Sequence, residues 1–173
     1  MRRKSSKGLQ RLCERTILGK LFTKGFDTLT DRVQTAVALR GEKGYNCAQA
    51  VLAAYADLFG LDEPTALKIA EGFGTGMGGM GETCGALTAA YMLVGLMNAT
   101  GSPDKAVRAD TYKKVRELTR AFKNETGATL CRELKGEGGR PVVPCPVCIA
   151  TAARLFEETM NRAGKAAKIK SID

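Results

Sequence analysis

Residues 46–60, NCAQAVLAAYADLFG, decide the fold class because they combine a helix start, a helical face and a helix stop. Asn46 is a favourable N-cap residue, and Gly60 is a favourable residue for ending a helix. Between them, apolar residues recur at intervals of three and four, which is the period of an amphipathic α-helix. The residues on that face are Val51, Ala54, Tyr55, Leu58 and Phe59.

The rest of the chain shows the same helical period. Further helices are predicted over residues 28–39, 62–71, 83–100, 103–123, 130–134 and about 146–160, and an amphipathic pattern around residues 9–17 suggests one more. Residues 72–81, GFGTGMGGMG, hold six glycines and are expected to form a loop. No alternating pattern indicates a strand. We therefore expect an all-α, single-domain multi-helix bundle of five to seven helices with a glycine-rich loop.

Local residues also predict where helices end and which faces are buried. Asp27 and Gly41 should bracket the helix over residues 28–39, and Ser102 should cap the next long helix with Pro103 at its first position. That helix is expected to turn Tyr112, Val115, Leu118 and Phe122 inward. The last helix is expected to bury Ile149, Ala152, Ala153, Phe156 and Met160.

The charge of the chain is concentrated at its start. The net charge is +9, and residues 1–25 contribute eight positive side chains and one negative. We therefore divide the chain into a basic, partly helical arm (1–26), a cysteine-containing helical domain (27–164) and a basic tail (165–173). The domain is nearly neutral, so no nucleic-acid binding is expected. Residues 1–25 could make weak contact with an anionic membrane surface, but a solvated tail or an upstream start codon is the favoured explanation.

The 173 residues include six cysteines and no histidine. Catalytic Ser-His and Cys-His pairs, histidine-ligated haem and Cys/His zinc fingers are thereby excluded. No secretory signal and no membrane-spanning stretch is recognised, so a cytoplasmic location is expected. In a reducing compartment, several cysteines suggest metal or redox chemistry more than structural disulfides.

Four cysteines fall at predicted helix starts. Cys47 follows the Asn46 cap, Cys84 follows the glycine loop, and Cys145 and Cys148 begin the last helix. Free N–H groups and the helix dipole favour a thiolate there, so we predict lowered thiol pKa values and convergence of these cysteines on one pocket. The alternative is that each cysteine is a small buried apolar residue.

Two motif matches carry little weight. Residues 74–79, GTGMGG, satisfy the dinucleotide-binding pattern G-x-G-x-x-G, but no strand precedes them. A better use of such glycines is close approach of the backbone to a cluster or substrate, for which Gly79, Gly81 and Gly85 are the candidates. Residues 145–148, CPVC, match a thioredoxin-type C-x-x-C without its β-α-β context, and remain plausible as a local dithiol.

Four ordered segments carry a family resemblance: GYNCAQAV (44–51), GETCGA (81–86), LCREL (130–134) and CP (145–146). They resemble the redox-active family named for its C-GCAxxG-C-C pattern, over roughly residues 30–163. The resemblance places Cys47, Cys84, Cys131 and Cys145 at the family's cysteine positions. The chain departs from the family in having Tyr45 where histidine is frequent, Ala89 in place of a glycine, and Cys148 as an addition.

The resemblance implies a redox-active or electron-transfer protein. Its cysteines would ligate an iron–sulfur cluster, through Cys47, Cys84, Cys131 and Cys145, or cycle between thiol and disulfide. The candidate catalytic thiols are these four and Cys148. The alternatives are an all-cysteine structural zinc protein and a non-enzymatic helical adaptor. The expected partner is a redox protein of unknown identity, and a homodimer is a further option.

Overall fold

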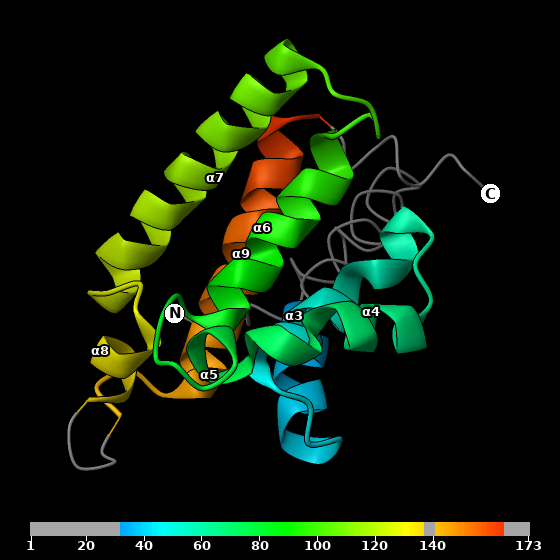
Figure 1. The fold of residues 1–173 in the computed structure, drawn as a ribbon. Coiled ribbons are helices and arrows are strands. Elements are labelled where there is room, and N and C mark those ends of the chain that lie inside the picture. Colours follow the sequence, from blue (N-terminus) through cyan, green and yellow to red (C-terminus); the bar gives the residue numbers. More distant parts are fainter. Residues whose placement is uncertain (1–31, 137–140, 165–173) are drawn as a thin grey trace, which may run out of the picture. The chain divides into compact units, whose positions relative to one another are not determined.

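The computed structural model describes residues 32–136 and 141–164. After a helical stretch over residues 32–42, the elements follow in the order shown in Figure 1. They are α3 (Cys47–Tyr55), the 3-10 helix η1 (Ala56–Phe59), α4 (Glu63–Ala70), the 3-10 helix η2 (Glu71–Phe73), α5 (Gly74–Met77), α6 (Gly85–Asn98), α7 (Lys105–Thr126), α8 (Cys131–Lys135) and α9 (Cys145–Arg162). Within the described residues, the only β pairing is an isolated bridge between Thr83 and Leu130. The predicted all-α multi-helix fold is confirmed.

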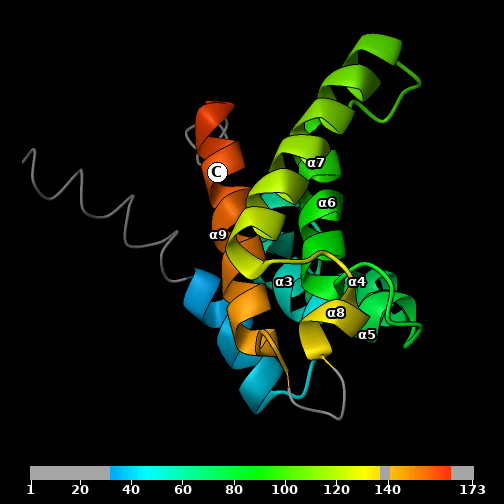
Figure 2. The ribbon, with the colours of Figure 1, turned by 90° about the vertical axis from the view of Figure 1, so that its left-hand side faces the viewer.

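Helix α6 is the centre of the bundle. It packs against α3, α7 and α9, and Figures 1 and 2 show α7 and α9 running alongside it. The helix is apolar on nearly every side, as expected of a helix enclosed by its neighbours. Its alanines allow close approach of the neighbouring backbones, and its larger residues fill the remaining space. Fully buried residues of α6 are Ala86, Leu87, Ala89, Ala90, Leu93 and Val94.

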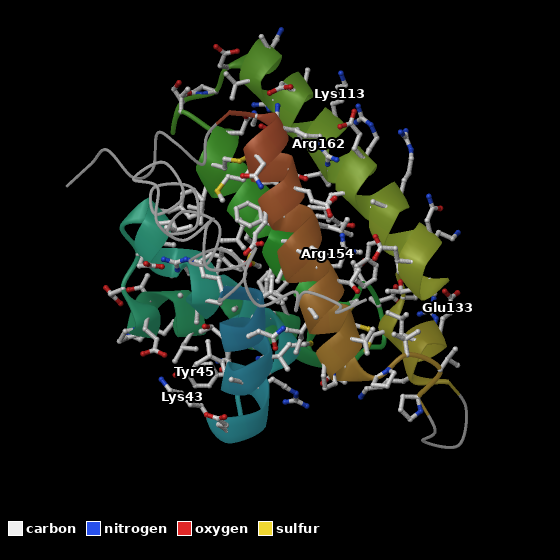
Figure 3. The ribbon with its side chains drawn as sticks, turned by 180° about the vertical axis from the view of Figure 1, so that it is seen from behind. Lys43, Tyr45, Lys113, Glu133, Arg154 and Arg162 are labelled. Carbon is white, nitrogen blue, oxygen red and sulfur yellow. The ribbon has the colours of Figure 1, made fainter. Side chains whose placement is uncertain are left out.

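Helix α9 buries the face that its sequence predicts. Ile149, Ala152, Ala153, Phe156 and Met160 are all buried. The Phe156 ring meets Tyr55 edge-on with centroids 5.2 Å apart, an arrangement that aromatic quadrupoles favour. On the outer side of α9, Arg154 forms ion pairs with Glu125 of α7 and with Glu158 (Figure 3).

The boundaries of α7 correct the prediction. Asp104, rather than Ser102, caps the helix, because its side chain accepts hydrogen bonds from the N–H groups of Ala106 and Val107 at 2.7 and 3.0 Å. The helix then continues three residues beyond the predicted end, to Thr126. Leu118 and Phe122 are buried as expected, and Val115 is partly buried. Tyr112 was expected inside, but 56% of its surface is exposed.

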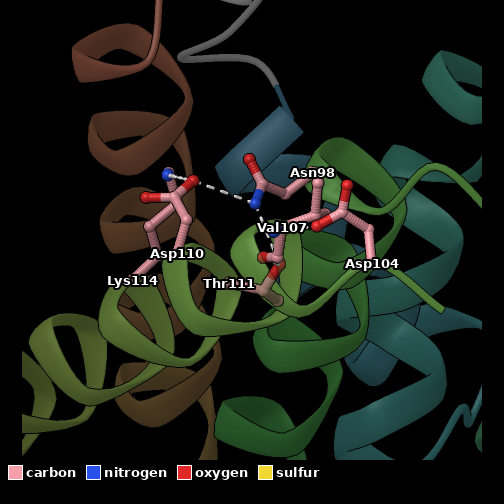
Figure 4. A network of polar contacts seen from close by, with 6 residues as sticks. All are labelled: Asn98, Asp104, Val107, Asp110, Thr111 and Lys114. Atoms are coloured by element: carbon pink, nitrogen blue, oxygen red, sulfur yellow. Dashed lines mark hydrogen bonds and ion pairs between the residues drawn. The ribbon is translucent and has the colours of Figure 1, made fainter.

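A polar network fixes the end of α6 to the start of α7 (Figure 4). The Asn98 side-chain amide donates to Asp110 at 3.0 Å and to Thr111 at 2.8 Å. Lys114 also pairs with Asp110 one helical turn away. These contacts lie at the end of α6 opposite Cys84, so they brace the bundle far from the cysteines.

The glycine-rich segment is more regular than the predicted loop. Residues 71–77 wind through η2 and α5, with three residues inside this stretch in the left-handed region. Thr75 has φ 54°, Gly76 has φ 70° and Met77 has φ 60°. Such left-handed residues change the direction of the chain after each short turn. Residue propensities do not predict this conformation for a threonine. The turn ends at Gly78, whose N–H donates to the carbonyl of Gly74.

Two helix ends also differ from the prediction. The first described helix continues through Gly41 to residue 42, and α6 begins at Gly85 rather than at residue 83. The Asp27 cap, the pattern at residues 9–17 with Cys13, the basic arm and the tail over residues 165–173 lie outside the described residues. Among the helices of residues 32–136 and 141–164, none has the length and apolar character needed to cross a membrane.

Candidate functional site

Five cysteines line one cavity of about 40 Å³. The cavity lies at the end of the bundle where α5 and α8 are found in Figure 1, because the chain begins α3, α6, α8 and α9 there. Its walls therefore come from segments far apart in the sequence. The lining residues are Arg40, Asn46, Cys47, Thr75, Cys84, Cys131, Leu134, Lys135, Val143, Cys145 and Cys148. The convergence of the cysteines on one pocket is thus present, whereas their chemical roles stay predictions.

The start of α3 places Cys47. The Asn46 side chain accepts from the N–H of Ala48 at 2.9 Å and of Gln49 at 3.0 Å, and the Gln49 side chain accepts from the Asn46 N–H at 3.0 Å. This capping box satisfies N–H groups that would otherwise lack partners. Asn46 also donates to the Glu71 carbonyl at 3.2 Å, which ties the helix start to the glycine-rich segment.

Gly85 gives the Cys47 sulfur its space. A Cβ at Gly85 would lie 2.6 Å from Cys47 Sγ and 2.6 Å from the carbonyl oxygen of Phe73. No side chain fits there without displacing the pocket wall. Gly85 therefore leaves the space that the Cys47 sulfur occupies. The predicted contact of Gly85 with a cofactor stays a prediction.

A short backbone pairing joins Cys131 to the segment before Cys84. The Cys131 N–H donates to the Glu82 carbonyl at 2.6 Å, and the Cys84 N–H donates to the Thr129 carbonyl at 2.8 Å. Gly76 packs against this pairing, since its Cβ would lie 2.6 Å from the Cys131 Cβ. The pairing holds α8, which has only five residues, against the start of α6.

The other two candidate glycines sit differently. Gly81 has φ +75° and its carbonyl accepts from the Arg132 N–H at 2.9 Å, so it belongs to the same pairing. Gly79 has φ +90° and no neighbour within 4 Å of a built Cβ. Neither lines the cavity.

Cys84 and Cys148 have the strongest mutual effect among the pocket thiols. Interaction with the Cys148 thiol is the largest cause that lowers the pKa of Cys84, and the backbone of Leu87 and Ala86 at the start of α6 acts in the same direction. Together they outweigh burial and bring the pKa of Cys84 to about 7. The pKa of Cys148 is raised well above its ordinary value, first by its interaction with Cys84 and then by burial. The Cys148 thiol itself donates a hydrogen bond to the Val143 carbonyl oxygen, at 3.9 Å.

Burial raises the pKa of two other cysteines. It is the largest cause that raises the pKa of Cys47, although the backbone of Thr75 and the charge of Arg40 act against it. Burial likewise raises the pKa of Cys131, against the charge of Lys135. The prediction that a helix start lowers the thiol pKa therefore holds for Cys84 and is wrong for Cys47 and Cys148.

Cys145 is the half-exposed thiol of the pocket. It was predicted at the N-cap of the last helix, but Pro144 occupies that position and Cys145 is the first helical residue. Cys148 follows three residues later and is buried. The pocket therefore has one thiol toward solvent and four thiols behind it.

The sulfur positions fit a metal ion less well than the count of cysteines suggests. Within the part of the chain that the structure describes, no three or more cysteine, aspartate or glutamate side chains are placed so that they could hold one metal ion together. The four predicted ligands line the same cavity, so ligation requires their side chains to turn toward a common centre. The arrangement in place is a set of free thiols around one cavity.

Sequence reasoning missed several residues around the pocket. Arg40 and Lys135 line it, as does Thr75, and no local motif in the sequence marks them. Tyr45, which stands where histidine is frequent in the family, does not line the cavity. Its hydroxyl donates to Glu63 at 2.7 Å, and Figure 3 shows it beside Lys43.

Comparison with known proteins identifies the family. No curated protein and no solved structure matches the chain. A family model described as "Putative redox-active protein (C_GCAxxG_C_C)" matches residues 45–159, which include the five cysteines of the pocket. The match spans well over half of the chain and agrees with the resemblance carried by the four cysteine segments. The chain therefore belongs to the C_GCAxxG_C_C family of redox-active proteins.

Proposed function

We propose that the chain is a thiol/disulfide redox protein whose couple is Cys84 and Cys148. The observation that carries this proposal is the placement of both thiols on one cysteine-lined cavity, where Cys148 is the largest cause of the lowered pKa of Cys84. One member is stabilised as a thiolate at a helix start, and the other keeps its proton. A nucleophilic thiol and a second thiol within reach are the two parts that thiol–disulfide exchange requires.

The reaction balances with a disulfide as the oxidant. The Cys84 thiolate attacks one sulfur of an incoming disulfide, a mixed disulfide forms, and the first substrate sulfur leaves as a thiolate. Cys148 then loses its proton and attacks Cys84 Sγ, which releases the second substrate thiolate. Two protein thiols become one disulfide, the substrate disulfide becomes two thiols, and the two protons and two electrons pass from protein to substrate.

The coupling between the two cysteines orders these steps. The Cys84 thiolate is the largest cause of the raised pKa of Cys148. Once Cys84 is part of a mixed disulfide it carries no charge, and this cause disappears. Cys148 therefore becomes easier to ionise at the moment when it is needed as the second nucleophile.

The test is to identify the disulfide that forms first. The reduced protein is equilibrated in buffers of increasing oxidised-to-reduced dithiothreitol ratio, trapped with acid and alkylating reagent, and mapped by peptide mass spectrometry. We expect a Cys84–Cys148 disulfide to dominate, and we expect Cys84→Ser to abolish it. A dominant disulfide that excludes Cys84 would overturn the proposal.

A metal centre is the second candidate, because Cys47, Cys84, Cys131 and Cys145 line one cavity. Four thiolates can hold an iron–sulfur cluster, which would supply one-electron transfer, or a structural zinc ion. Reconstitution under strict anaerobiosis with iron and sulfide, and separately with zinc, tests this candidate. Bound metal that survives gel filtration and is lost in Cys131→Ala would support it. Failure of both metals to bind stoichiometrically would rule it out.

A further inference from the structure

The pocket has an unbalanced charge. Its two charged lining residues other than cysteine are Arg40 and Lys135, and both are cations. Both are exposed, and neither forms an ion pair with another described residue. The long helices α3, α6 and α9 also direct their N-termini toward this end, which adds positive potential.

No acidic side chain stands among the described lining residues to offset this charge. Protonated cysteines are neutral and do not cancel it. A reduced pocket with a surplus of positive charge attracts anions to its mouth.

The size of the cavity limits what can enter. About 40 Å³ admits the sulfur end of a small molecule but not its body. The remainder of such a molecule must stay at the mouth, where Arg40, Lys135 and the half-exposed Cys145 are found. Arg40 is held in place there, since one of its N–H groups donates to the Tyr45 carbonyl at 2.8 Å.

We infer that the oxidant of this pocket is a small disulfide that carries carboxylate groups close to its sulfurs, with Arg40 and Lys135 binding those carboxylates. Arginine presents donors in a fork that matches a carboxylate, and lysine supplies a second point charge. The sulfur that accepts attack then faces the cavity. This inference rests on the proposed function, because it names the substrate class of the Cys84–Cys148 couple.

The experiment compares two chromogenic aromatic disulfides that differ in charge. One is 5,5′-dithiobis(2-nitrobenzoate), which carries two carboxylates, and the other is 4,4′-dithiodipyridine, which is neutral at pH 7. Reduced full-length protein with Cys13→Ser reacts with each by stopped flow at low ionic strength. We expect Arg40→Gln with Lys135→Gln to lower the rate with the anionic reagent about tenfold, and to change the rate with the neutral reagent less than twofold.

The controls separate charge at the pocket from charge in general. Lys105→Gln with Arg108→Gln removes the same charge from the far end of α7 and should leave both rates unchanged. Arg40→Lys should recover most of the anionic rate that Arg40→Gln loses. An anionic-to-neutral rate ratio that is the same in the wild type and the double pocket variant would overturn the inference.

The two proposals fail in different ways. Mass spectrometry of the reaction products reports whether Cys84 and Cys148 become linked, which tests the proposed function. The rate ratio reports the charge preference of whichever pocket thiol reacts, and so tests the substrate class by itself. If no pocket thiol reacts with either reagent, both proposals are wrong.

Discussion

Two titratable pairs join α9 to other helices, and their surroundings shift pKa values in opposite directions. Cys148 of α9 is the largest cause that lowers the pKa of Cys84, to about 7. Glu157 of α9 accepts from the Tyr55 hydroxyl at 2.7 Å in the middle of the bundle, and burial raises the pKa of this carboxyl to about 7. Both pairs are buried, so burial alone does not decide the charge state.

The difference lies in the backbone around each pair. Cys84 is the N-cap of α6, and the backbone of Leu87 and Ala86 at this helix start lowers its pKa. Glu157 lies well inside α9, where the N–H groups are already used within the helix. A buried anion is therefore stabilised at the start of α6, whereas burial shifts Glu157 in the core and Cys47 at the start of α3 toward their neutral forms.

The largest effect is expected from closing the space at the pocket end. Gly85→Ala places a methyl group against the Cys47 sulfur and the Phe73 carbonyl, which should destabilise the protein by about 2 kcal/mol. Gly95→Ala, on the same helix with no neighbour within 4 Å, should stabilise it by about 0.5–1 kcal/mol. Urea unfolding of both variants measures the difference in their free energies of unfolding. Equal changes in the two variants would show that the pocket wall moves to accommodate the methyl group at residue 85.

The charge state of the core pair is tested by pH. Because the folded protein holds the Glu157 proton more tightly than the unfolded chain does, this group stabilises the protein at pH 4–5, and that contribution is lost as the pH rises through about 7. Glu157→Gln stays neutral and can still accept from Tyr55. Between pH 5 and pH 8 the wild type should lose about 2 kcal/mol more than the variant in urea unfolding. Parallel pH profiles would contradict the assignment.

The smallest effect concerns the pocket pair. Cys148→Ala removes the largest cause of the lowered pKa of Cys84, so this pKa should rise by about one unit and alkylation of Cys84 by iodoacetamide at pH 7 should slow about fivefold. The pH profile of Cys84 alkylation, followed by mass spectrometry, measures this shift. Cys131→Ala removes another buried pocket thiol, which is not among the causes that lower the pKa of Cys84, and should leave the profile unchanged. If both variants shift it equally, the interaction with Cys148 is not the cause.

Much of the fold follows from local sequence. The Asn46 cap and the buried face of α9 were predicted because caps and helical periodicity are local properties. The start of α7 was predicted wrongly because Ser102 and Asp104 are both good caps, and only the tertiary structure selects one. The exposure of Tyr112 was also missed because the tertiary structure, and not the local sequence, decides which side chains of α7 are covered.

The candidate site was predictable in its thiols but not in their pairing. Helix starts brought Cys47, Cys84 and Cys145 into one hypothesis, and the structure places them around one cavity. Which thiol ionises depends on burial and on a neighbour from another helix, and neither can be inferred from a motif. Cys148, which the resemblance left as an addition, lines the same cavity and is the largest cause of the lowered pKa of Cys84.

The backbone pairing between Glu82 and Cys131 has a consequence for how the interior is reached. Helix α8 is too short to persist alone, and these few hydrogen bonds retain it. Their rupture would release α8 as a unit while α3, α6 and α9 stay packed, so the cysteines could be uncovered without global unfolding. The exchange rate of the Cys131 amide hydrogen with deuterated solvent would then serve as a clock for this opening.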